Sequence, residues 1–454
     1  MRWITRDKTF YTTLVSLAIP VALQNLITFS VNFADNLMVG ALGDAAVSGV
    51  YMGNQIQTFL QMFSGGIEGA ILILAAQYWG KKDVVSIRKI VSIGIRTAVV
   101  FSLLLTMVCL LVPGPIIRMF SHDAEVIAAG SIYLRIVCLS YLFFCLTQGL
   151  IAAMRSIEVV RIGMKVSLIS LVANVSLNYI LIFGKLGLPA LGIRGAAIAT
   201  LIARMVETTV MIVYVFRIDQ ILGLKLSDLK YSDKTLMKDF LRNGLPIVCG
   251  NVVWSVNLMV STAILGRFNA GVTTAASVAN TMNSLAYIAM NGMSAAVGII
   301  TGKTVGAGKT EQMKEYARTV QILFLGVGLL TGGMVQLLKN PFVGLYSGIS
   351  AEAAAFSKQF INVLSVTMIG TCYQAACLFG LVKSGGDVGF VFKMDTIFVF
   401  LIVLPSAMIT AYLGLPAWVV FACLKCDQIL KCFVAVVKIN SFNWMKNLTR
   451  ENAA

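Results

Sequence analysis

The sequence predicts an all-α polytopic membrane protein whose twelve transmembrane helices form two six-helix lobes. Hydrophobic residues make up 58% of the 454 residues, and charged residues only 12%, against the roughly 25% typical of soluble domains. Apolar runs of about 18 residues or more recur along the chain, and each is long enough to cross a bilayer. The two halves also repeat each other at a nearly constant offset. A secreted or nucleic-acid-binding globular protein is therefore excluded.

Twelve apolar runs lie between breaks made by charged residues, glycine or proline. The first six spans are expected near 11–37, 47–77, 90–112, 127–153, 162–183 and 195–216. The second six are expected near 245–266, 272–301, 319–338, 356–381, 390–412 and 416–437. The first run is too long for the core of a signal peptide, so we expect it to remain as a membrane span.

Lysine and arginine residues distinguish the two sides of the expected membrane. Of the 36 basic residues, 25 fall in the N-terminal segment, alternate loops and the C-terminal tail, whereas six fall in the intervening loops. Cytoplasmic loops retain Lys and Arg, so both termini are expected in the cytoplasm of a multi-pass protein of the cytoplasmic (inner) membrane. The net charge of +16 follows from these loops, and we expect no nucleic-acid partner.

A direct repeat relates the two halves of the chain at an offset of 226 to 228 residues. The matching positions are Pro20 and Pro246, Gly40 and Gly266, Gly80 and Gly306, Met154-Arg155-Ser156 and Val382-Lys383-Ser384, and the tetrapeptide Gly-Leu-Pro-Ala at 187–190 and 414–417. Six spans per repeat is an even number, so the lobes should be related by a pseudo-two-fold axis along the membrane normal. The expected domains are an N-terminal lobe (1–216), a cytoplasmic linker (217–243), a C-terminal lobe (244–438) and a cytoplasmic tail (439–454).

Two bundles joined by a linker favour a transporter that works by alternating access. An enzyme would need a catalytic set, but the single histidine, His122, falls in an expected outer loop, and no GxSxG, HExxH or GxxxxGK[ST] motif is present. We therefore expect no enzyme activity. Two alternatives stay open. One is a flippase for a lipid-linked precursor, whose cavity would need basic residues such as Arg96, Arg135 and Arg204; the other is a membrane-bound enzyme or receptor.

Charged residues inside the expected spans are costly, on the order of 2.5 to 3.5 kcal/mol each at the centre of a helix. Arg204 and Glu207 are spaced i,i+3, and Asp427 and Lys431 are spaced i,i+4, so each pair is expected to neutralise itself on one helix.

Two further acids have no such partner at helical spacing. Asp395 lies near the expected cytoplasmic surface, where solvent or Lys393 explains it as readily as a relay role. Glu68 lies in a glycine-rich part of the second span with no opposite charge within four residues, so a function and a tertiary partner are both open. Both acids are possible secondary sites for cation coupling.

Asp35 is the leading candidate for chemistry, because it lies deep in the first span with no basic residue within helical reach. A carboxylate in such a place can exchange a proton, a sodium ion or a cationic substrate. Asn174 and Asn178 lie on one face of the fifth span, where their amide groups could bind a hard cation, hold a carboxylate or join helices.

The order and spacing of several motifs resemble the multidrug and toxic compound extrusion (MATE) family over essentially the whole chain. The motifs are residues 35–40 and 43–47, residues 154–156 followed by Asn174 and Asn178, residues 383–387, and the ending at 441–449, which is similar to a bacterial branch of that family. The resemblance implies two six-helix lobes around a central cavity. It also implies export of drugs or metabolites, driven by inward movement of sodium ions or protons.

Carried over from the resemblance, Asp35, Asn174, Asn178 and Thr200 are expected to form a cation-coupling site in the N-terminal lobe. Some members place a glutamate two turns after the proline of the seventh span, but Trp254 stands there in this chain. The expected partners are the lipid bilayer and small hydrophobic or cationic substrates. The protein is expected to be a monomer. No resident cofactor or metal is expected, only the transported Na⁺ or H⁺.

Overall fold

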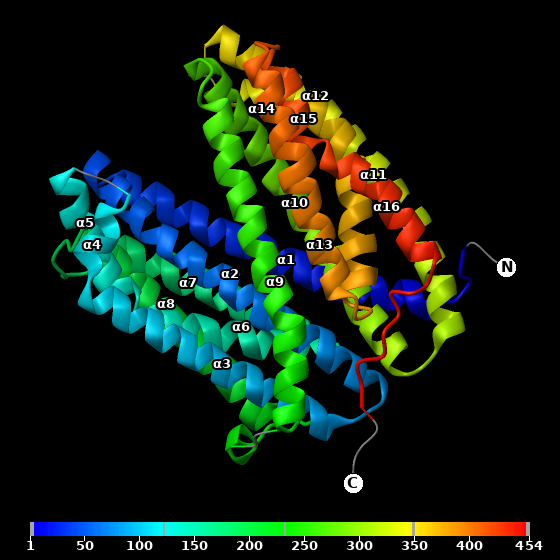
Figure 1. The fold of residues 1–454 in the computed structure, drawn as a ribbon. Coiled ribbons are helices and arrows are strands. Elements are labelled where there is room, and N and C mark those ends of the chain that lie inside the picture. The colour runs from blue at the N-terminus through cyan, green and yellow to red at the C-terminus, as the bar shows by residue number, and fades with distance from the viewer. Residues whose placement is uncertain (1–3, 121–122, 231–232, 347–349, 451–454) are drawn as a thin grey trace. The chain divides into compact units, whose positions relative to one another are not determined.

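The computed structural model describes residues 4–120, 123–230, 233–346 and 350–450, and every regular element within these ranges is a helix (Figure 1). His122 lies outside the described residues. The helices of the N-terminal half are α1 (Lys8–Gly40), α2 (Asp44–Gly80), α3 (Val84–Leu111), α4 (Pro113–Arg118), α5 (Ala124–Val137), α6 (Ser140–Ser156), α7 (Arg161–Phe183) and α8 (Ile193–Val213), which continues into a π-helical turn, η1 (Tyr214–Ile218).

The C-terminal half follows a short 3₁₀ turn, η2 (Leu226–Lys230). Two π-helical segments, η3 and η4, interrupt its α-helices. In order, the elements are α9 (Lys234–Leu265), α10 (Ala270–Gly306), α11 (Thr310–Gly344), α12 (Ala351–Gln374), η3 (Ala375–Lys383), α13 (Val388–Ile397), η4 (Phe398–Val403), α14 (Leu404–Tyr412), α15 (Ala417–Lys425) and α16 (Asp427–Asn440).

Each of the twelve expected spans coincides with helix. Among the described residues, ten continuous helices are long and apolar enough to cross a membrane, and α5 with α6, bent by 51°, make an eleventh if the pair is one span. The last expected span is the pair α15 and α16, which breaks at Cys426 and carries Lys425, Asp427 and Lys431 close to the break. The chain is thus an all-α integral membrane protein.

The N-terminal unit, Leu23–Val248, is one of two compact units into which contacts divide the chain. Within it α2 packs on α3, α5 and α6, and α7 packs on α8. The expected linker is held against α3, because Arg88 Nε donates a 2.6 Å hydrogen bond to the carbonyl of Leu222 and Lys89 lies 3.7 Å from Asp233.

The C-terminal unit consists of Met1–Ala22 and Cys249–Ala454. Its first segment is tied to α11, since the amide of Thr5 donates to Thr319 Oγ1 at 2.9 Å and the Tyr316 hydroxyl donates to Asp7 at 2.5 Å. The boundaries expected at 216 and 244 differ from this division, because α1 and α9 each contribute residues to both units. The two divisions fall close to Pro20 and Pro246, which interrupt the hydrogen bonding of those helices.

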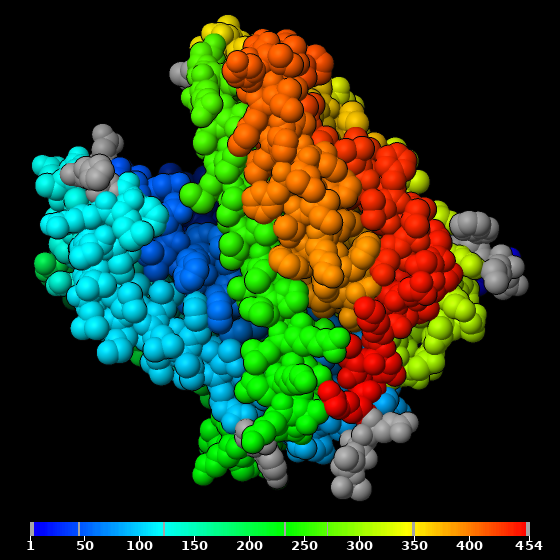
Figure 2. Space-filling model, viewed as in Figure 1, coloured from blue at the N-terminus to red at the C-terminus, as the bar shows by residue number. Residues whose placement is uncertain are grey.

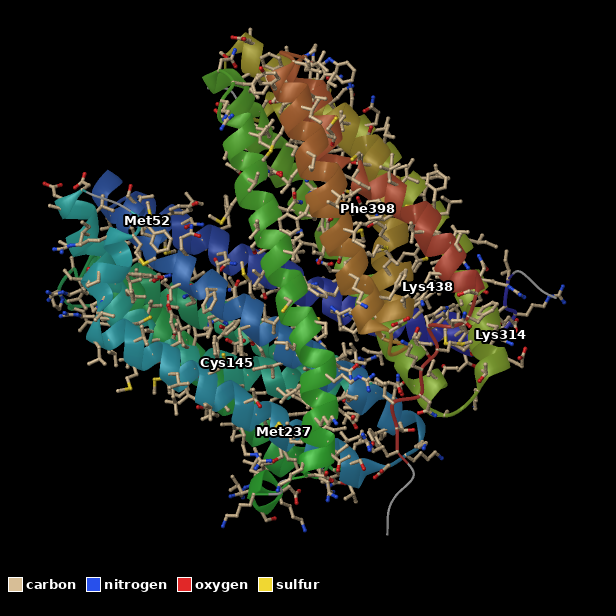
Figure 3. All side chains as sticks on the ribbon, in the orientation of Figure 1. Met52, Cys145, Met237, Lys314, Phe398 and Lys438 are labelled. Atoms are coloured by element: carbon tan, nitrogen blue, oxygen red, sulfur yellow. The ribbon has the colours of Figure 1, made fainter. Side chains whose placement is uncertain are left out.

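The C-terminal tail is packed against the C-terminal unit and joins two motifs that lie far apart in the sequence. From Ser441 to Arg450 the chain runs without regular structure, drawn in red in Figures 1 and 2. Trp444 is fully buried, and the amide of Lys446 donates to the carbonyl of Gly385 at 2.8 Å. Asp387 binds both Lys438, labelled in Figure 3, at 2.7 Å and Lys446 at 2.8 Å. The tail thus fastens the turn between η3 and α13.

Candidate cation site

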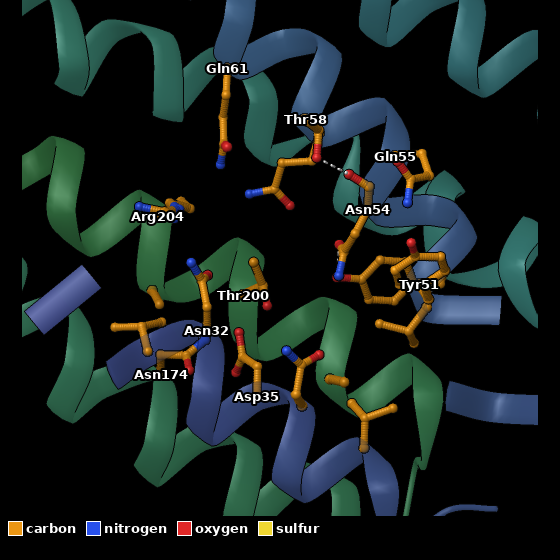
Figure 4. Close-up of a pocket in the computed structure, with 18 of the residues that line it drawn as sticks. Asn32, Asp35, Tyr51, Asn54, Gln55, Thr58, Gln61, Asn174, Thr200 and Arg204 are labelled. Carbon is orange, nitrogen blue, oxygen red and sulfur yellow. Dashed lines mark hydrogen bonds between the residues drawn. The ribbon is translucent and has the colours of Figure 1, made fainter. Parts of the chain in front are cut away.

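Asp35 lies in the part of α1 that belongs to the N-terminal unit, where it lines a cavity of about 260 Å³ (Figure 4). The Asn178 amide on α7 donates a hydrogen bond to the Asp35 carboxylate. Among the described residues, no lysine or arginine nitrogen forms a salt bridge with this carboxylate within 4.0 Å; Arg204 acts on it only from a greater distance. Neutral donors therefore hold Asp35.

Asn174 and Asn178 are consecutive on one face of α7, as their i,i+4 spacing requires. Both side chains are buried, and Asn178 Nδ2 also donates to Asn174 Oδ1 at 3.1 Å. The Oδ1 atom of Asn178 is buried without a hydrogen-bond partner among the described residues. Carboxylate and amide oxygens are the ligands that hard cations prefer, so the group has the donor atoms for Na⁺ as well as for a proton.

The α8 wall of the cavity contains Thr200 and Arg204. Arg204 Nη1 lies 2.7 Å from the Glu207 carboxylate, which also accepts a hydrogen bond from Ser170 at 3.3 Å. The Arg204–Glu207 pair expected from the sequence is confirmed. Because Glu207 binds this guanidinium, Arg204 borders the cavity without binding Asp35.

The α2 wall supplies polar side chains that sequence reasoning missed. Tyr51, Asn54, Gln55, Thr58 and Gln61 all line the cavity, as Figure 4 shows. Asn54 also accepts a hydrogen bond from the Tyr133 hydroxyl on α5 at 3.1 Å. The signal was the i,i+4,i+7 spacing of Asn54, Thr58 and Gln61, which places three polar residues on one face of an apolar span.

Glu68 is not part of this cavity. Its carboxylate accepts a 2.9 Å hydrogen bond from Ser64 and interacts electrostatically with Arg155, which in turn donates to Gln24 at 2.7 Å. The structure thus gives Glu68 a hydrogen-bond partner on its own helix and an opposite charge, Arg155, on α6.

Asp395 lies in the C-terminal unit, and its charged partner is one that helical spacing did not suggest. Its carboxylate binds Lys431 at 2.8 Å and remains 21% exposed, while Lys431 also binds Asp427 at 3.0 Å. The i,i+4 pair of Asp427 and Lys431 is confirmed, but it belongs to a three-membered cluster. Lys393 is exposed, because it lies on a different face of α13 from Asp395.

Two separate segments, residues 20–180 and 246–409, match the model of the protein family described as MatE. A probable multidrug resistance protein NorM of Rhizobium meliloti is 27% identical over 367 residues, which are 79% of this chain and 78% of the relative. A probable NorM of Listeria innocua is 23% identical over 96% of this chain and 95% of its own.

Solved structures share the fold. The bent form of the Vibrio cholerae MATE transporter VcmN superposes with a TM-score of 0.87 at 16% identity, covering 96% of this chain and 97% of that one. A MOP superfamily transporter from Pyrococcus furiosus gives a TM-score of 0.84 at 17% identity, covering 97% and 99% of the two chains.

Proposed function

The chain belongs to the MatE family, and from this premise we propose that it is a secondary active exporter of small molecules. Inward movement of a proton or a sodium ion would drive substrate efflux by alternating access. The names of the NorM relatives, which describe multidrug resistance, support small-molecule drugs as substrates. We propose that these substrates are hydrophobic or cationic. We further propose a monomer in the cytoplasmic membrane, with both termini in the cytoplasm and no resident cofactor.

The observation that carries this proposal is the Asp35 carboxylate, held by amide groups in a polar cavity. A carboxylate bound to a fixed ammonium or guanidinium has little to exchange, whereas one held by neutral donors can take up a cation and release it. Pockets that bind drug-sized ligands usually measure about 300–1,000 Å³. A cavity of about 260 Å³ therefore suits the coupling ion and its water better than the exported substrate.

The energetics of one coupling ion are adequate for useful export. One charge that crosses a potential of about 100 mV supplies roughly 2.3 kcal/mol. Since about 1.4 kcal/mol corresponds to a tenfold ratio, this energy supports between one and two decades of gradient for a neutral substrate. Outward movement of a cationic substrate would offset part of this gain.

A flippase for a lipid-linked precursor is less well supported, because pyrophosphate recognition calls for a strongly basic cavity. Of Arg96, Arg135 and Arg204, only Arg204 lines the described cavity, and Glu207 neutralises it. Asp35 adds a negative charge to the same cavity.

Purified protein in vesicles with an imposed ion gradient tests the proposal. The Asp35→Asn variant should reduce efflux of a panel of cationic dyes to the level of protein-free vesicles, while Asp35→Glu, which keeps a carboxylate, should retain part of it. Asp123→Asn is the matched control, because Asp123 caps α5 and asparagine caps a helix equally well. Replacing sodium by choline, with and without a pH gradient, distinguishes the two ions. Wild-type efflux by Asp35→Asn would remove Asp35 from the mechanism.

A further inference from the structure

A second buried cluster of charged side chains lies in the C-terminal unit. Lys431 on α16 contacts the carboxylates of Asp395 at 2.8 Å and Asp427 at 3.0 Å. Asp427 and Lys431 are each only 5% exposed. The cluster coincides with irregular backbone, because α16 begins at Asp427 after the break at Cys426 and η4 begins three residues after Asp395. Such interruptions in helices frequently mark functional sites.

The internal repeat relates this cluster to the candidate cation site. At the offset of 227 that aligns the shared tetrapeptide, Thr200 corresponds to Asp427 and Arg204 corresponds to Lys431. Both members of the N-terminal pair line the cavity that contains Asp35.

A second wall of the two sites also corresponds. At an offset of 226, Gln61 matches Tyr287, and Tyr287 interacts electrostatically with Asp427. The corresponding positions of the two repeats are therefore both polar, but the C-terminal positions include a carboxylate, Asp427, where the N-terminal positions have the neutral Thr200.

The two sites differ in what the basic residue does. In the N-terminal unit Arg204 binds Glu207 on its own helix, and Asp35 keeps only neutral hydrogen-bond donors. In the C-terminal unit Lys431 binds both carboxylates directly.

Other groups around the cluster add positive charge or hydrogen bonds. Lys383 of η3 interacts electrostatically with Asp395, and Lys425 of α15 with Asp427. Gln428 donates to the Asp427 carboxylate at 3.1 Å. The Lys431 ammonium also lies 5.8 Å from the ring centre of Phe398, which is labelled in Figure 3. Lys383 and Lys425 act from a greater distance, whereas Lys431 is the one lysine among the described residues that forms salt bridges with these two carboxylates within 4.0 Å. A mobile cation would therefore have to displace its ammonium.

We propose that Lys431 is a tethered cation, which permanently fills the C-terminal counterpart of the ion site and leaves ion exchange to the N-terminal unit alone. This inference rests on the proposed function, because it assigns the number of coupling ions per cycle. An ammonium fixed to the protein satisfies Asp395 and Asp427 in every state of the cycle, so this site moves no ion across the membrane. Lys431 thereby determines the stoichiometry of coupling.

Ion binding to the purified full-length chain tests the inference without any substrate. Radioactive sodium binding, if the coupling ion is Na⁺, or difference proton titration, if it is H⁺, should show that Asp35→Asn loses the exchangeable ion. Adding Asp395→Asn, Asp427→Asn and Lys431→Met to that variant should then change nothing. If the Asp35→Asn protein still binds an ion and the three additional substitutions abolish it, the tethered-cation assignment is wrong.

A gain-of-function variant tests whether Lys431 keeps a mobile ion out of the cluster. In the Asp35→Asn background, Lys431→Met should restore about one exchangeable ion per chain, because two adjacent carboxylates without their ammonium cannot both remain charged and empty. Lys431→Arg is the matched control and should restore none. If a folded Lys431→Met protein takes up no ion, the proposal fails.

Transport measurements cover the case in which Lys431→Met does not fold. The triple variant Asp395→Asn, Asp427→Asn and Lys431→Met removes all three charges of the cluster and leaves no uncompensated charge. Such replacements of buried ion pairs are often tolerated. With Asp35 intact, this triple variant should export within about twofold of wild type, with the same ratio of ions to substrate; a lower ratio would refute the proposal. If wild-type protein moves none of the dyes, the proposed function is in doubt, while the binding experiments still decide the role of Lys431.

Discussion

At the scale of single residues, the partner of each buried charge decides what that charge can do. Asp35 has amide partners and a cavity beside it, whereas Asp427 has an ammonium 3.0 Å away. Asp387 illustrates a third case, a carboxylate outside the membrane-spanning helices that holds two lysines and fastens the C-terminal tail.

The pH dependence of this fastening can be predicted. Burial raises the pKa of Asp387, but hydrogen bonds and attraction from Lys438 and Lys446 outweigh it, so the pKa lies below its ordinary value. A lowered pKa stabilises the fold above the pKa of the unfolded chain, and this contribution is lost as the pH falls through the folded pKa.

Asp387→Asn should therefore reduce the free energy of unfolding by about 1.5–3 kcal/mol at neutral pH. The difference from wild type should shrink below about pH 4, where the wild-type carboxyl is increasingly protonated. Thermal unfolding of both proteins over a pH series measures this effect, with Asp123→Asn as the control. A difference that stays constant on acidification would contradict the ion-pair explanation.

The sequence predicted the residues of the site better than their partners. Asp35, Asn174 and Asn178 lie together, and Thr200 lines the same cavity as Asp35. A buried carboxylate and stacked amides are unusual enough in apolar spans to be noticed one at a time, whereas Thr200 and the grouping of all four came from the family resemblance. Asp395 and Lys431 are 36 residues apart in the chain and lie on different helices. Helical spacing contains no information about such a pair. The α2 wall was missed because its residues are uncharged. Burying a neutral polar side chain in a membrane span costs less free energy than burying a charge, so these residues were not singled out in the sequence.

At the scale of helices, each of the twelve apolar runs coincides with helix, but the runs did not give the lengths of the helices. The start of α9 at Lys234 precedes the apolar limit near 245 by about three turns. Hydropathy detects only the part of a helix that faces lipid, whereas the helix continues into water wherever its end can still pack. Breaks such as the 51° bend between α5 and α6 leave no clear mark in hydropathy.

Close packing of α7 and α8 provides a prediction at this scale. A Cβ atom at Gly195 would lie 2.5 Å from the carbonyl oxygen of Leu181 and 3.0 Å from the amide nitrogen of Ile182, both backbone atoms that cannot move aside easily. Gly195→Ala should therefore destabilise the protein by about 1–3 kcal/mol, as overpacked cores do.

Gly149→Ala is the matched control for this substitution. Gly149 is also buried in a helix, yet its added Cβ would meet only Ile71 Cδ1, at an ordinary 3.9 Å. Alanine there should leave the thermal unfolding midpoint unchanged or raise it slightly, because alanine favours helix over glycine. Equal effects of the two substitutions would show that backbone crowding at Gly195 is unimportant.

At the scale of the whole molecule, each half of the chain completes the unit formed mainly by the other half. Residues 1–22 belong to the C-terminal unit, and the start of α9, through Val248, belongs to the N-terminal unit. The repeat in the sequence predicted two similar halves but could not show this exchange, because it depends on which residues pack together after the chain has folded.

This exchange predicts how separated halves behave. A fragment that begins at residue 218 lacks the contacts of Thr5 and Asp7 with α11, and a fragment that ends at residue 217 lacks the first turns of α9. Each fragment expressed alone should accumulate poorly, and co-expression should restore both. Membrane fractionation and immunoblotting give the measurement. Full accumulation of the C-terminal fragment by itself would contradict this prediction.

The hydrogen bond between Tyr316 and Asp7 also bears on biosynthesis, because its partners are 309 residues apart. At roughly 5–20 residues per second, the ribosome would need about 15–60 s after making Asp7 to produce Tyr316. Throughout that interval Asp7 lacks this native partner. The segment that carries Asp7 therefore completes its native contacts long after it is synthesised, and any chaperone that protects it must act until Tyr316 has emerged.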